Sequence, residues 1–373
     1  MAGAPFGGSE ELWTRTAVLL AKQGLPVAAS VHGWPQLDPR ISEVSRAGVE
    51  LRSRPVKPSL IGLARRYLSG KPQLTIDIEQ SFGNTSPNFV VISTGSFASL
   101  PIELVEMCIA KDWPFAILAH SNFSGWWPFD KLADRLRKAL PLARRCFFVS
   151  EANRVLAEKQ LGYDIDNAEI VRNPVTVAIN SFIPWPVDAS EYGLRIASVG
   201  NLFPTEKGQD ILLEILASPS WTERKWQLTF YGGGPSRDVL ERLVERLKLR
   251  DRVSFAGYVA AENIWRDNHL LVMPSRYEGG PMTTIEAMFC GRPVVATKVG
   301  SNPEFIKDGV TGYLAETAAV ECFGTALERM WVERDRLEEI GKLAAADIRK
   351  SIPDDPVGLF AERLKALVNL ETQ

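Results

Sequence analysis

Short apolar runs of strand length alternate with longer amphipathic segments along the chain, and this alternation constrains the fold more than any other feature. The pattern is typical of parallel sheets covered by helices. We expect strands at 26–31, 89–93, 115–119 and 146–149, and a helix at 10–22, in the first half of the chain. In the second half we expect strands at 194–199, 226–231, 253–256, 270–273 and 293–296, and helices at 209–216, 237–247, 283–289 and 318–331.

Chain length and a local change in amino-acid composition together predict two domains. A chain of 373 residues exceeds the roughly 250 to 300 residues at which a single core stops growing. Around 173–190 the sequence becomes rich in proline, which resists regular structure. We therefore expect an N-terminal Rossmann-like domain at 1–175, a linker at 176–190, a C-terminal Rossmann-like domain at 191–350, and a helix at 351–373 that packs back on the N-terminal domain.

Composition excludes several classes of protein. The net charge is −2, from 43 basic and 45 acidic residues, so no overall field attracts nucleic acid. The four cysteines have no metal-like spacing and are expected to be reduced and buried. There is no apolar run of about 18 residues and no signal-peptide pattern at the start, so a cytoplasmic location is expected.

The most informative stretch is 273–288, where an expected strand leads into a glycine-rich loop and then a helix. Glycines let a backbone approach a ligand, and a helix N-terminus presents free N–H groups that suit a diphosphate. Glu278 and Glu286 flank the loop, and carboxylates accept strong hydrogen bonds from sugar hydroxyls. For an isolated pair, the simpler explanation is a helix-capping glutamate and a solvated helical glutamate.

Other strand ends add candidate residues. Lys207 follows the strand at 194–199, and a lysine there can neutralise a diphosphate leaving group. Gly232, Gly233 and Tyr258 follow the next two strands, in loops that can approach a base and a ribose.

With these motifs in place, the second half resembles glycosyltransferase family four, whose members are retaining enzymes of the GT-B fold. The spacing of Glu278 and Glu286 matches the family's glutamate pair, and the stretches at 287–297, 300–306 and 308–314 are similar to its consensus. The resemblance is dense from about 195 to 316 and weaker before the linker. It implies an α/β fold of two Rossmann-like domains whose parallel sheets face each other across an interdomain cleft.

The resemblance also assigns roles. Glu278 would contact the transferred sugar, Glu286 would hold the ribose and Lys207 would bind the diphosphate. Backbone N–H groups of the loop would face sugar and phosphate; the loop residues are Gly279, Gly280, Pro281 and Met282. Asn201 stands where the family usually has an arginine, which puts part of the phosphate clamp in doubt. Arg276 is either the replacement cation or a surface residue.

In the first half, Gly7 and Gly8 resemble the family's glycine-rich loop that faces donor phosphates, although an ordinary turn before a helix remains an alternative. His120 follows the strand at 115–119 and resembles the family's active-site histidine; a structural histidine is the alternative. His32 follows the strand at 26–31 and is a candidate for the acceptor side. His269 precedes a core strand and is expected to pack.

The resemblance therefore implies a retaining hexosyltransferase that uses a UDP- or GDP-linked sugar and a glycan, lipid-linked or small-molecule acceptor. The one Asp-x-Asp sequence, at 164–166, lies before the linker and away from the motifs above, so we expect neither a metal nor another cofactor. The segment 52–71 combines basic and apolar residues, which indicates either peripheral contact with an anionic membrane or a solvated basic loop. A non-catalytic sugar-nucleotide binding protein and a nucleotide-sugar epimerase of the same fold remain alternatives.

Overall fold

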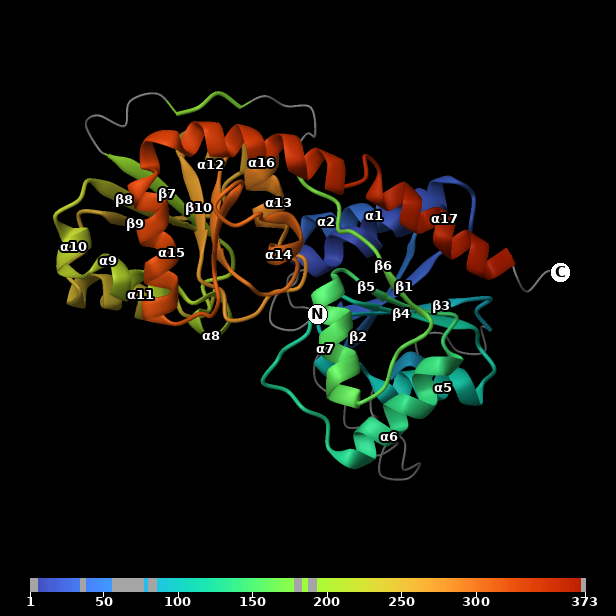
Figure 1. Ribbon diagram of the computed structural model, residues 1–373. Helices are drawn as coiled ribbons and strands as arrows, with labels where there is room; N and C mark the ends of the chain where they lie inside the picture. The colour runs from blue at the N-terminus through green and yellow to red at the C-terminus, as the bar shows by residue number, and fades with distance from the viewer. Residues whose placement is uncertain are drawn as a thin grey trace. The chain divides into compact units, whose positions relative to one another are not determined.

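The computed structural model describes residues 6–33, 38–55, 77–79, 86–177, 183–186 and 193–369. The chain divides into two compact units, the first formed by Met1–Pro174 together with Asp355–Gln373 and the second by Val175–Asp354 (Figure 1). Each unit is an α/β structure built on parallel sheets. Among the described helices, none is long and apolar enough to cross a membrane.

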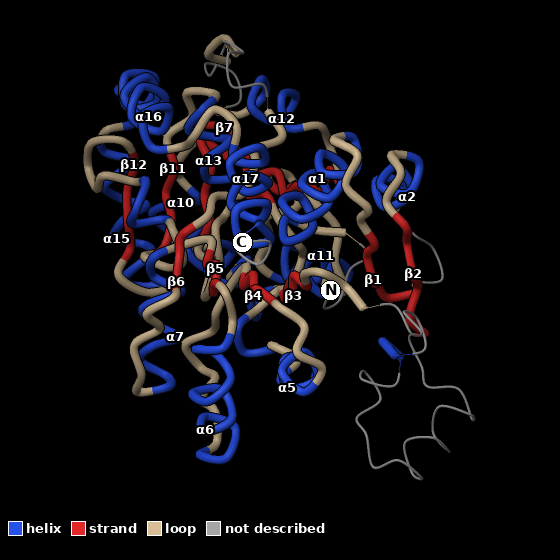
Figure 2. The backbone as a smooth tube through the Cα atoms, turned by 90° about the vertical axis from the view of Figure 1, so that its right-hand side faces the viewer, coloured by secondary structure: helices blue, strands red, loops and turns tan. Residues whose placement is uncertain are grey.

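The first unit contains a four-stranded parallel sheet in the order β3-β4-β5-β6 and a separate parallel pair, β1-β2 (Figure 2). Its strands are β1 (Ala28–Gly33), β2 (Glu50–Pro55), β3 (Val90–Thr94), β4 (Phe115–Ala119), β5 (Arg145–Phe148) and β6 (Ala168–Ile170). Its helices are α1 (Gly8–Lys22), α2 (Pro39–Arg46), α5 (Ile102–Ala110), α6 (Asp130–Ala139), α7 (Glu151–Leu161) and α17 (Pro356–Asn369).

The second unit contains one six-stranded parallel sheet in the order β12-β11-β10-β7-β8-β9. Its strands are β7 (Leu194–Val199), β8 (Trp226–Tyr231), β9 (Val253–Gly257), β10 (Leu270–Met273), β11 (Val294–Thr297) and β12 (Gly312–Ala315). Its helices are α8 (Pro204–Lys207), α9 (Gln209–Leu216), α10 (Pro219–Thr222), α11 (Arg237–Arg246), α12 (Ala261–Asp267), α13 (Met282–Phe289), α14 (Asn302–Phe305), α15 (Val320–Val332) and α16 (Leu337–Ser351).

Both faces are buried at the centre of the six-stranded sheet, where every residue of β10 and β11 is buried and β10 reads as an unbroken apolar run. Neighbouring residues of one strand enter different cores, because successive side chains point to opposite faces. Ile196 belongs to the core that contains α9 and α15 residues, whereas Ala197 belongs to the core that contains α13 and α16 residues. The sheet is thus a middle layer between two layers of helices.

Helix α17 belongs to the first unit, although it is the last element of the chain. It lies against α1, as both Figure 1 and Figure 2 show. Phe360 of α17 meets Phe147 of β5 edge to face, with 5.1 Å between ring centroids. Leu12 of α1 lies in the same core cluster.

The sequence placed β4, β7, β8, β10 and α9 at the bounds that the structure has. It missed β2, however. Arg52 and Arg54, which open the basic segment 52–71, lie on β2 in register with β1. These two arginines are therefore part of a strand and not of a solvated loop. Arg52 also forms an ion pair with Glu50 at 2.9 Å. The remainder of the segment, 56–71, lies outside the described residues.

The stretch expected to be a linker, 176–190, is described only at 176–177 and 183–186, and these residues pack on the second unit. Val177 and Ile183 are buried in its core. The fully buried guanidinium of Arg292 donates hydrogen bonds to main-chain carbonyls, among them that of Pro184 at 2.6 Å. Its other described acceptors are the carbonyls of Trp265, Asn268, Cys290 and Ile183.

We predict that Phe360→Ala lowers the free energy of unfolding of the first unit by about 3 to 5 kcal/mol, because the substitution opens a cavity between α17 and β5. Urea denaturation followed by circular dichroism measures the change. Leu359→Ala, an exposed position on the same helix, is the control and should alter stability by less than about 0.5 kcal/mol. Equal effects of the two substitutions would contradict the packing role of α17.

Candidate active site

The order of strands in the second unit creates a switch point between β7 and β10. From β7 the chain proceeds to β8 and β9 on one side, and it then returns to place β10 on the other side of β7. In open parallel sheets ligands bind beyond the carboxyl ends of the two strands at such a point. Lys207 lies in the segment that follows β7, and Glu278 lies in the loop that follows β10.

Lys207 and Glu278 are in direct contact at this point. The Lys207 ammonium donates to Oε1 of Glu278 at 2.6 Å, and the Ser275 hydroxyl donates to the same oxygen at 2.8 Å. The Glu278 side chain is only 7% exposed, so its carboxylate is held by the cation and the hydroxyl and largely shielded from water. The structure thus brings together two residues that are 71 positions apart in sequence.

Two glycines in the left-handed region let the loops around this pair approach each other. Gly208 has φ of +65°, and a Cβ there would lie 2.0 Å from the carbonyl oxygen of Pro274. Gly300 has φ of +54°, and a Cβ there would lie 2.3 Å from the carbonyl oxygen of Gly279. Both contacts are with backbone, so no side chain can be accommodated without moving a loop of the site.

The glycine-rich loop leads directly into α13. Gly279 is buried, and its carbonyl accepts from the Ser301 N–H at 3.0 Å, which fixes the loop against the segment after β11. Pro281 is the N-cap of α13 and Met282 its first residue. The N–H groups of a helix's first turn have no acceptor within the helix, so this end of α13 offers donors to an anion.

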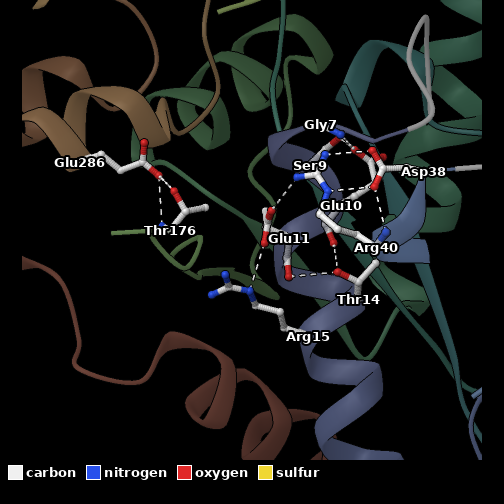
Figure 3. A network of polar contacts seen from close by, with 10 residues as sticks. All are labelled: Gly7, Ser9, Glu10, Glu11, Thr14, Arg15, Asp38, Arg40, Thr176 and Glu286. Carbon is white, nitrogen blue, oxygen red and sulfur yellow. Dashed lines mark hydrogen bonds and ion pairs between the residues drawn. The ribbon is translucent and has the colours of Figure 1, made fainter. Parts of the chain in front are cut away.

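Glu286 is buried in the second turn of α13. Its Oε1 accepts from both the hydroxyl and the N–H of Thr176, at 2.6 Å and 3.1 Å (Figure 3). The sequence analysis did not predict a role for Thr176, because it lies 110 positions from Glu286 and no local sequence pattern indicates the contact.

The guanidinium of Arg276 donates hydrogen bonds to a carboxylate and to a main-chain carbonyl. It forms a two-fold hydrogen-bonded ion pair with Asp210, at 2.8 Å and 2.7 Å, and also donates to the carbonyl of Pro204. The Asp210 carboxylate raises the pKa of Arg276. These contacts tie the loop after β10 to α8 and α9.

The loop after β8 contacts both the first loop of the unit and the loop after β9. Gly232 has φ of +119°, and a Cβ on it would lie 2.2 Å from the carbonyl oxygen of Gly200, next to Asn201. The Tyr258 ring packs on Gly233, and its side chain is otherwise exposed. Asn201 itself is exposed, and its carbonyl accepts from Gln209 at 2.9 Å.

In the first unit, Gly7 and Gly8 begin α1, and the polar network around them is drawn in Figure 3. Glu10 is buried and accepts from the Gly7 N–H at 2.9 Å and from the Ser9 hydroxyl at 2.7 Å. Burial raises the pKa of Glu10. Glu11, also buried, forms ion pairs with Arg15 and Arg40 at 3.0 Å and 3.4 Å. The sequence analysis missed both glutamates, although Glu10 stands at the third helical position, where a side chain can reach back to the N-cap.

His120 stands at the carboxyl end of β4 and is buried. Its Nε2 lies 3.2 Å from the Ser93 hydroxyl, and the Asn173 side chain lies nearby. Burial lowers the pKa of His120 to about 4, against a smaller opposing effect of Asn173, so the ring is neutral at neutral pH. Burial, with a contribution from Arg54, also lowers the pKa of His32 on β1.

His269 packs, as the sequence predicts. Its Nδ1 accepts from the Arg195 N–H at 2.9 Å, and its ring lies 5.4 Å from that of Trp185. Among the described residues there is no cluster of three or more His, Cys, Asp or Glu side chains that could hold a metal ion.

Two α/β units, each built on a parallel sheet, are the architecture of the GT-B fold. The structure of HepE from Anabaena in complex with UDP-glucose is similar over 98% of each chain, with a TM-score of 0.74 and 18% identity. Sucrose-phosphate synthase from Thermosynechococcus elongatus is similar with a TM-score of 0.73 and 17% identity, over 98% of this chain and 94% of that one. The fold expected from the sequence is confirmed.

Residues 193–332 match the family described as glycosyl transferases group 1. The chain therefore carries a domain of this glycosyltransferase family, and the resemblance to family four drawn from its motifs is confirmed.

Relatives of known activity agree with this assignment. A D-inositol 3-phosphate glycosyltransferase of Mycolicibacterium smegmatis is 33% identical over 191 residues, which cover 45% of this chain and 43% of the relative. An alpha-D-kanosaminyltransferase of Streptomyces kanamyceticus is 32% identical over 143 residues, which cover 38% and 37%. This chain thus spans less than half the length of these two relatives. A GDP-mannose-dependent mannosyltransferase of M. smegmatis that acts on phosphatidylinositol monomannoside is 27% identical over 65% of this chain and 68% of its own length.

The lowered pKa of His120 predicts acid sensitivity. Since the folded state keeps this ring neutral while the unfolded chain protonates below about 6.5, stability is lost as pH falls from 6.5 towards 4. By pH 5 the loss amounts to about 2 kcal/mol. Urea denaturation at pH 7 and pH 5 measures it, and His120→Gln should show a correspondingly smaller difference. An unchanged pH dependence in the variant would contradict the neutral, buried state of this ring.

Proposed function

We propose that the protein transfers a hexose from a UDP- or GDP-linked donor, with retention of configuration and without a bound metal, to a glycan, lipid-linked or small-molecule acceptor. The observation that carries this proposal is the contact of Lys207 with Glu278 at the switch point, beside the N-terminus of α13. A cation, a carboxylate and a helix N-terminus are what a diphosphate linked to a sugar requires of its site.

Binding of the donor would replace the ion pair of Lys207 with Glu278 by an ion pair of Lys207 with the diphosphate. A diphosphate oxygen replaces Glu278 as the partner of Lys207, and the N–H groups of Gly279, Gly280 and Met282, in the loop and at the start of α13, bind further phosphate oxygens. Glu278, released by the lysine, stays in place because Ser275 donates to it at 2.8 Å. Its carboxylate then accepts hydrogen bonds from hydroxyls of the sugar.

Nucleoside recognition would use the other loops of this edge. Glu286 accepts from ribose hydroxyls, and Thr176 orients its carboxylate. The exposed Tyr258 ring, supported by Gly233, offers a face to the base. Two similar proteins, one solved in complex with UDP-glucose and the other a GDP-mannose-dependent enzyme, support both donor classes and leave the base open.

The chemical step would be a front-face exchange at the anomeric carbon. The bond from this carbon to the diphosphate breaks, the acceptor oxygen forms its bond on the same face, and the acceptor proton passes to a diphosphate oxygen. Lys207 and α13 stabilise the negative charge that develops on the leaving group. His120, neutral, would donate or accept a hydrogen bond at the reacting sugar, and His32 would lie on the acceptor side. A lipid-linked acceptor would suit the basic segment 52–71.

A non-catalytic nucleotide-sugar binding protein is the second candidate. It is favoured by Asn201 in the place of the usual arginine and by the engagement of Arg276 with Asp210, which together leave Lys207 as the cation in contact with Glu278. Turnover with any acceptor decides between the two candidates, and a donor altered without an acceptor would indicate an epimerase.

We predict that one of UDP, GDP and ADP, or its sugar, raises the melting temperature of the protein selectively, and that Glu286→Ala abolishes this shift. Thermal denaturation with each nucleotide measures it. Thr176→Val is the matched control, since it removes the hydroxyl that contacts Glu286 and keeps the carboxylate. It should retain most of the shift. A shift that survives in Glu286→Ala would show that this carboxylate does not hold the nucleotide.

We further predict that a chelator leaves turnover unchanged, because Lys207 and α13 neutralise the diphosphate. Lys207→Met should then lower kcat by roughly 10²- to 10³-fold. Lys298→Met, which removes a lysine paired with Glu316 elsewhere on the second unit, should not. Radiolabelled sugar transfer measures all three. Activity lost in chelator and restored by a divalent cation would reject the metal-independent mechanism.

A further inference from the structure

The helix α8 carries Lys207 but is only one turn long. It has four residues, Pro204–Lys207, and the N–H groups of Glu206 and Lys207 both donate to the carbonyl of Phe203 at 3.0 Å. A single helical turn is not stable by itself, because nucleation costs more than one turn of hydrogen bonds contributes. The position of α8, and with it that of the Lys207 ammonium, therefore depends on contacts with other elements.

Glu206, the residue before Lys207, is bound by the loop after β10 through both its main chain and its side chain. The Arg276 N–H donates to the Glu206 carbonyl at 2.7 Å. The Tyr277 hydroxyl donates to Oε1 of the Glu206 carboxylate, also at 2.7 Å. Two successive residues of the loop thus hold one residue of α8, and the next residue on each side forms the ion pair of Lys207 with Glu278.

The Tyr277 hydroxyl remains a donor at neutral pH. Burial is the largest cause that raises the pKa of Tyr277, and its hydrogen bond to Glu206 and the charges of Glu206 and Glu278 raise it further. The phenol therefore stays protonated. A hydrogen bond from a hydroxyl to a carboxylate is charge-assisted and stronger than one between neutral groups.

This hydrogen bond is independent of the ion pair that the donor would replace. In the function proposed above, a diphosphate takes Lys207 from Glu278, so that ion pair no longer links α8 to the loop after β10. The hydrogen bond of Tyr277 with Glu206 does not involve the lysine and is kept. The guanidinium of Arg276 holds the start of α8 and the start of α9, whereas Tyr277 holds the residue next to the lysine.

We propose that Tyr277 and Glu206 are a positioning pair that keeps the Lys207 ammonium aligned with the second phosphate of the nucleotide, the one bonded to the sugar. The inference rests on the function proposed above, in which Glu278 contacts the sugar. Since Lys207 contacts Glu278 directly, the lysine lies at the phosphate next to the sugar. Without the hydrogen bond, Arg276 still attaches α8 to the loop, but the lysine is no longer held in line with this phosphate.

The experiment measures by isothermal titration calorimetry how much more tightly the protein binds UDP than UMP, and GDP than GMP. Tyr277→Phe removes the donor of the hydrogen bond and Glu206→Ala removes the acceptor. Each should reduce the preference for the diphosphate by roughly fivefold, the net contribution of about one hydrogen bond. The affinity for the monophosphate should be unchanged, because only the second phosphate depends on the alignment of the lysine. The double variant should lose no more than either single variant, since both remove the same bond.

Two further variants separate the hydrogen bond from other effects. Glu206→Gln removes the charge but keeps an oxygen acceptor, so it should retain the wild-type preference. Its comparison with Glu206→Ala tests the same bond independently of Tyr277→Phe. Thr229→Val is the matched control, since it removes a hydroxyl that lies 3.0 Å from the Ser254 hydroxyl, within strands β8 and β9 of the same unit. It should change neither affinity.

An unchanged preference in Tyr277→Phe would overturn the inference and leave the proposed function intact. The same holds if Tyr277→Phe weakens monophosphate and diphosphate by one common factor, which indicates a merely structural role, or if Glu206→Gln loses as much as Glu206→Ala. A wild type that binds none of the four nucleotides would overturn the proposed function and this inference together.

Discussion

The contact between Lys207 and Glu278 is the interaction on which the organisation of the second unit's edge depends. A carboxylate that is almost entirely buried must be paired with a cation or protonated, and breaking such a pair on one side costs about 3 to 5 kcal/mol. The lysine reaches it only because Gly208 allows α8 to turn against Pro274, and because Arg276 fastens the two loops through Asp210.

The same unit contains a cation that is buried more fully than Lys207 and is paired with main-chain carbonyls. Arg292 is fully buried, and every described hydrogen bond of its guanidinium goes to a main-chain carbonyl. Burial lowers its pKa to about 10, so it remains charged at neutral pH. Partial negative charges of several carbonyls balance it, and two of these belong to Ile183 and Pro184. The arginine thereby attaches this short segment to the second unit. The chain passes back to the first unit at Asp355, just before α17.

Sequence reasoning succeeded where one local signal dominated. β10 is buried throughout and is a continuous apolar run, and β7 and β8 are mostly apolar with two polar residues each. It failed for β2, in which arginines alternate with other residues, and for β6 and β12, which are short. A parallel strand of this kind is defined by the neighbour with which it pairs, and pairing is a non-local property.

By itself, the sequence determined the α/β class, the glutamate spacing around α13 and the family to which the second unit belongs, because spacing within one strand, loop and helix is fixed by local geometry. Only the tertiary structure decided which groups meet: Lys207 with Glu278, Thr176 with Glu286, Arg276 with Asp210. It also decided that His120 is neutral, since a pKa is set by burial and not by residue type. These are contacts across 66 to 110 positions, and chain folding alone brings such positions together.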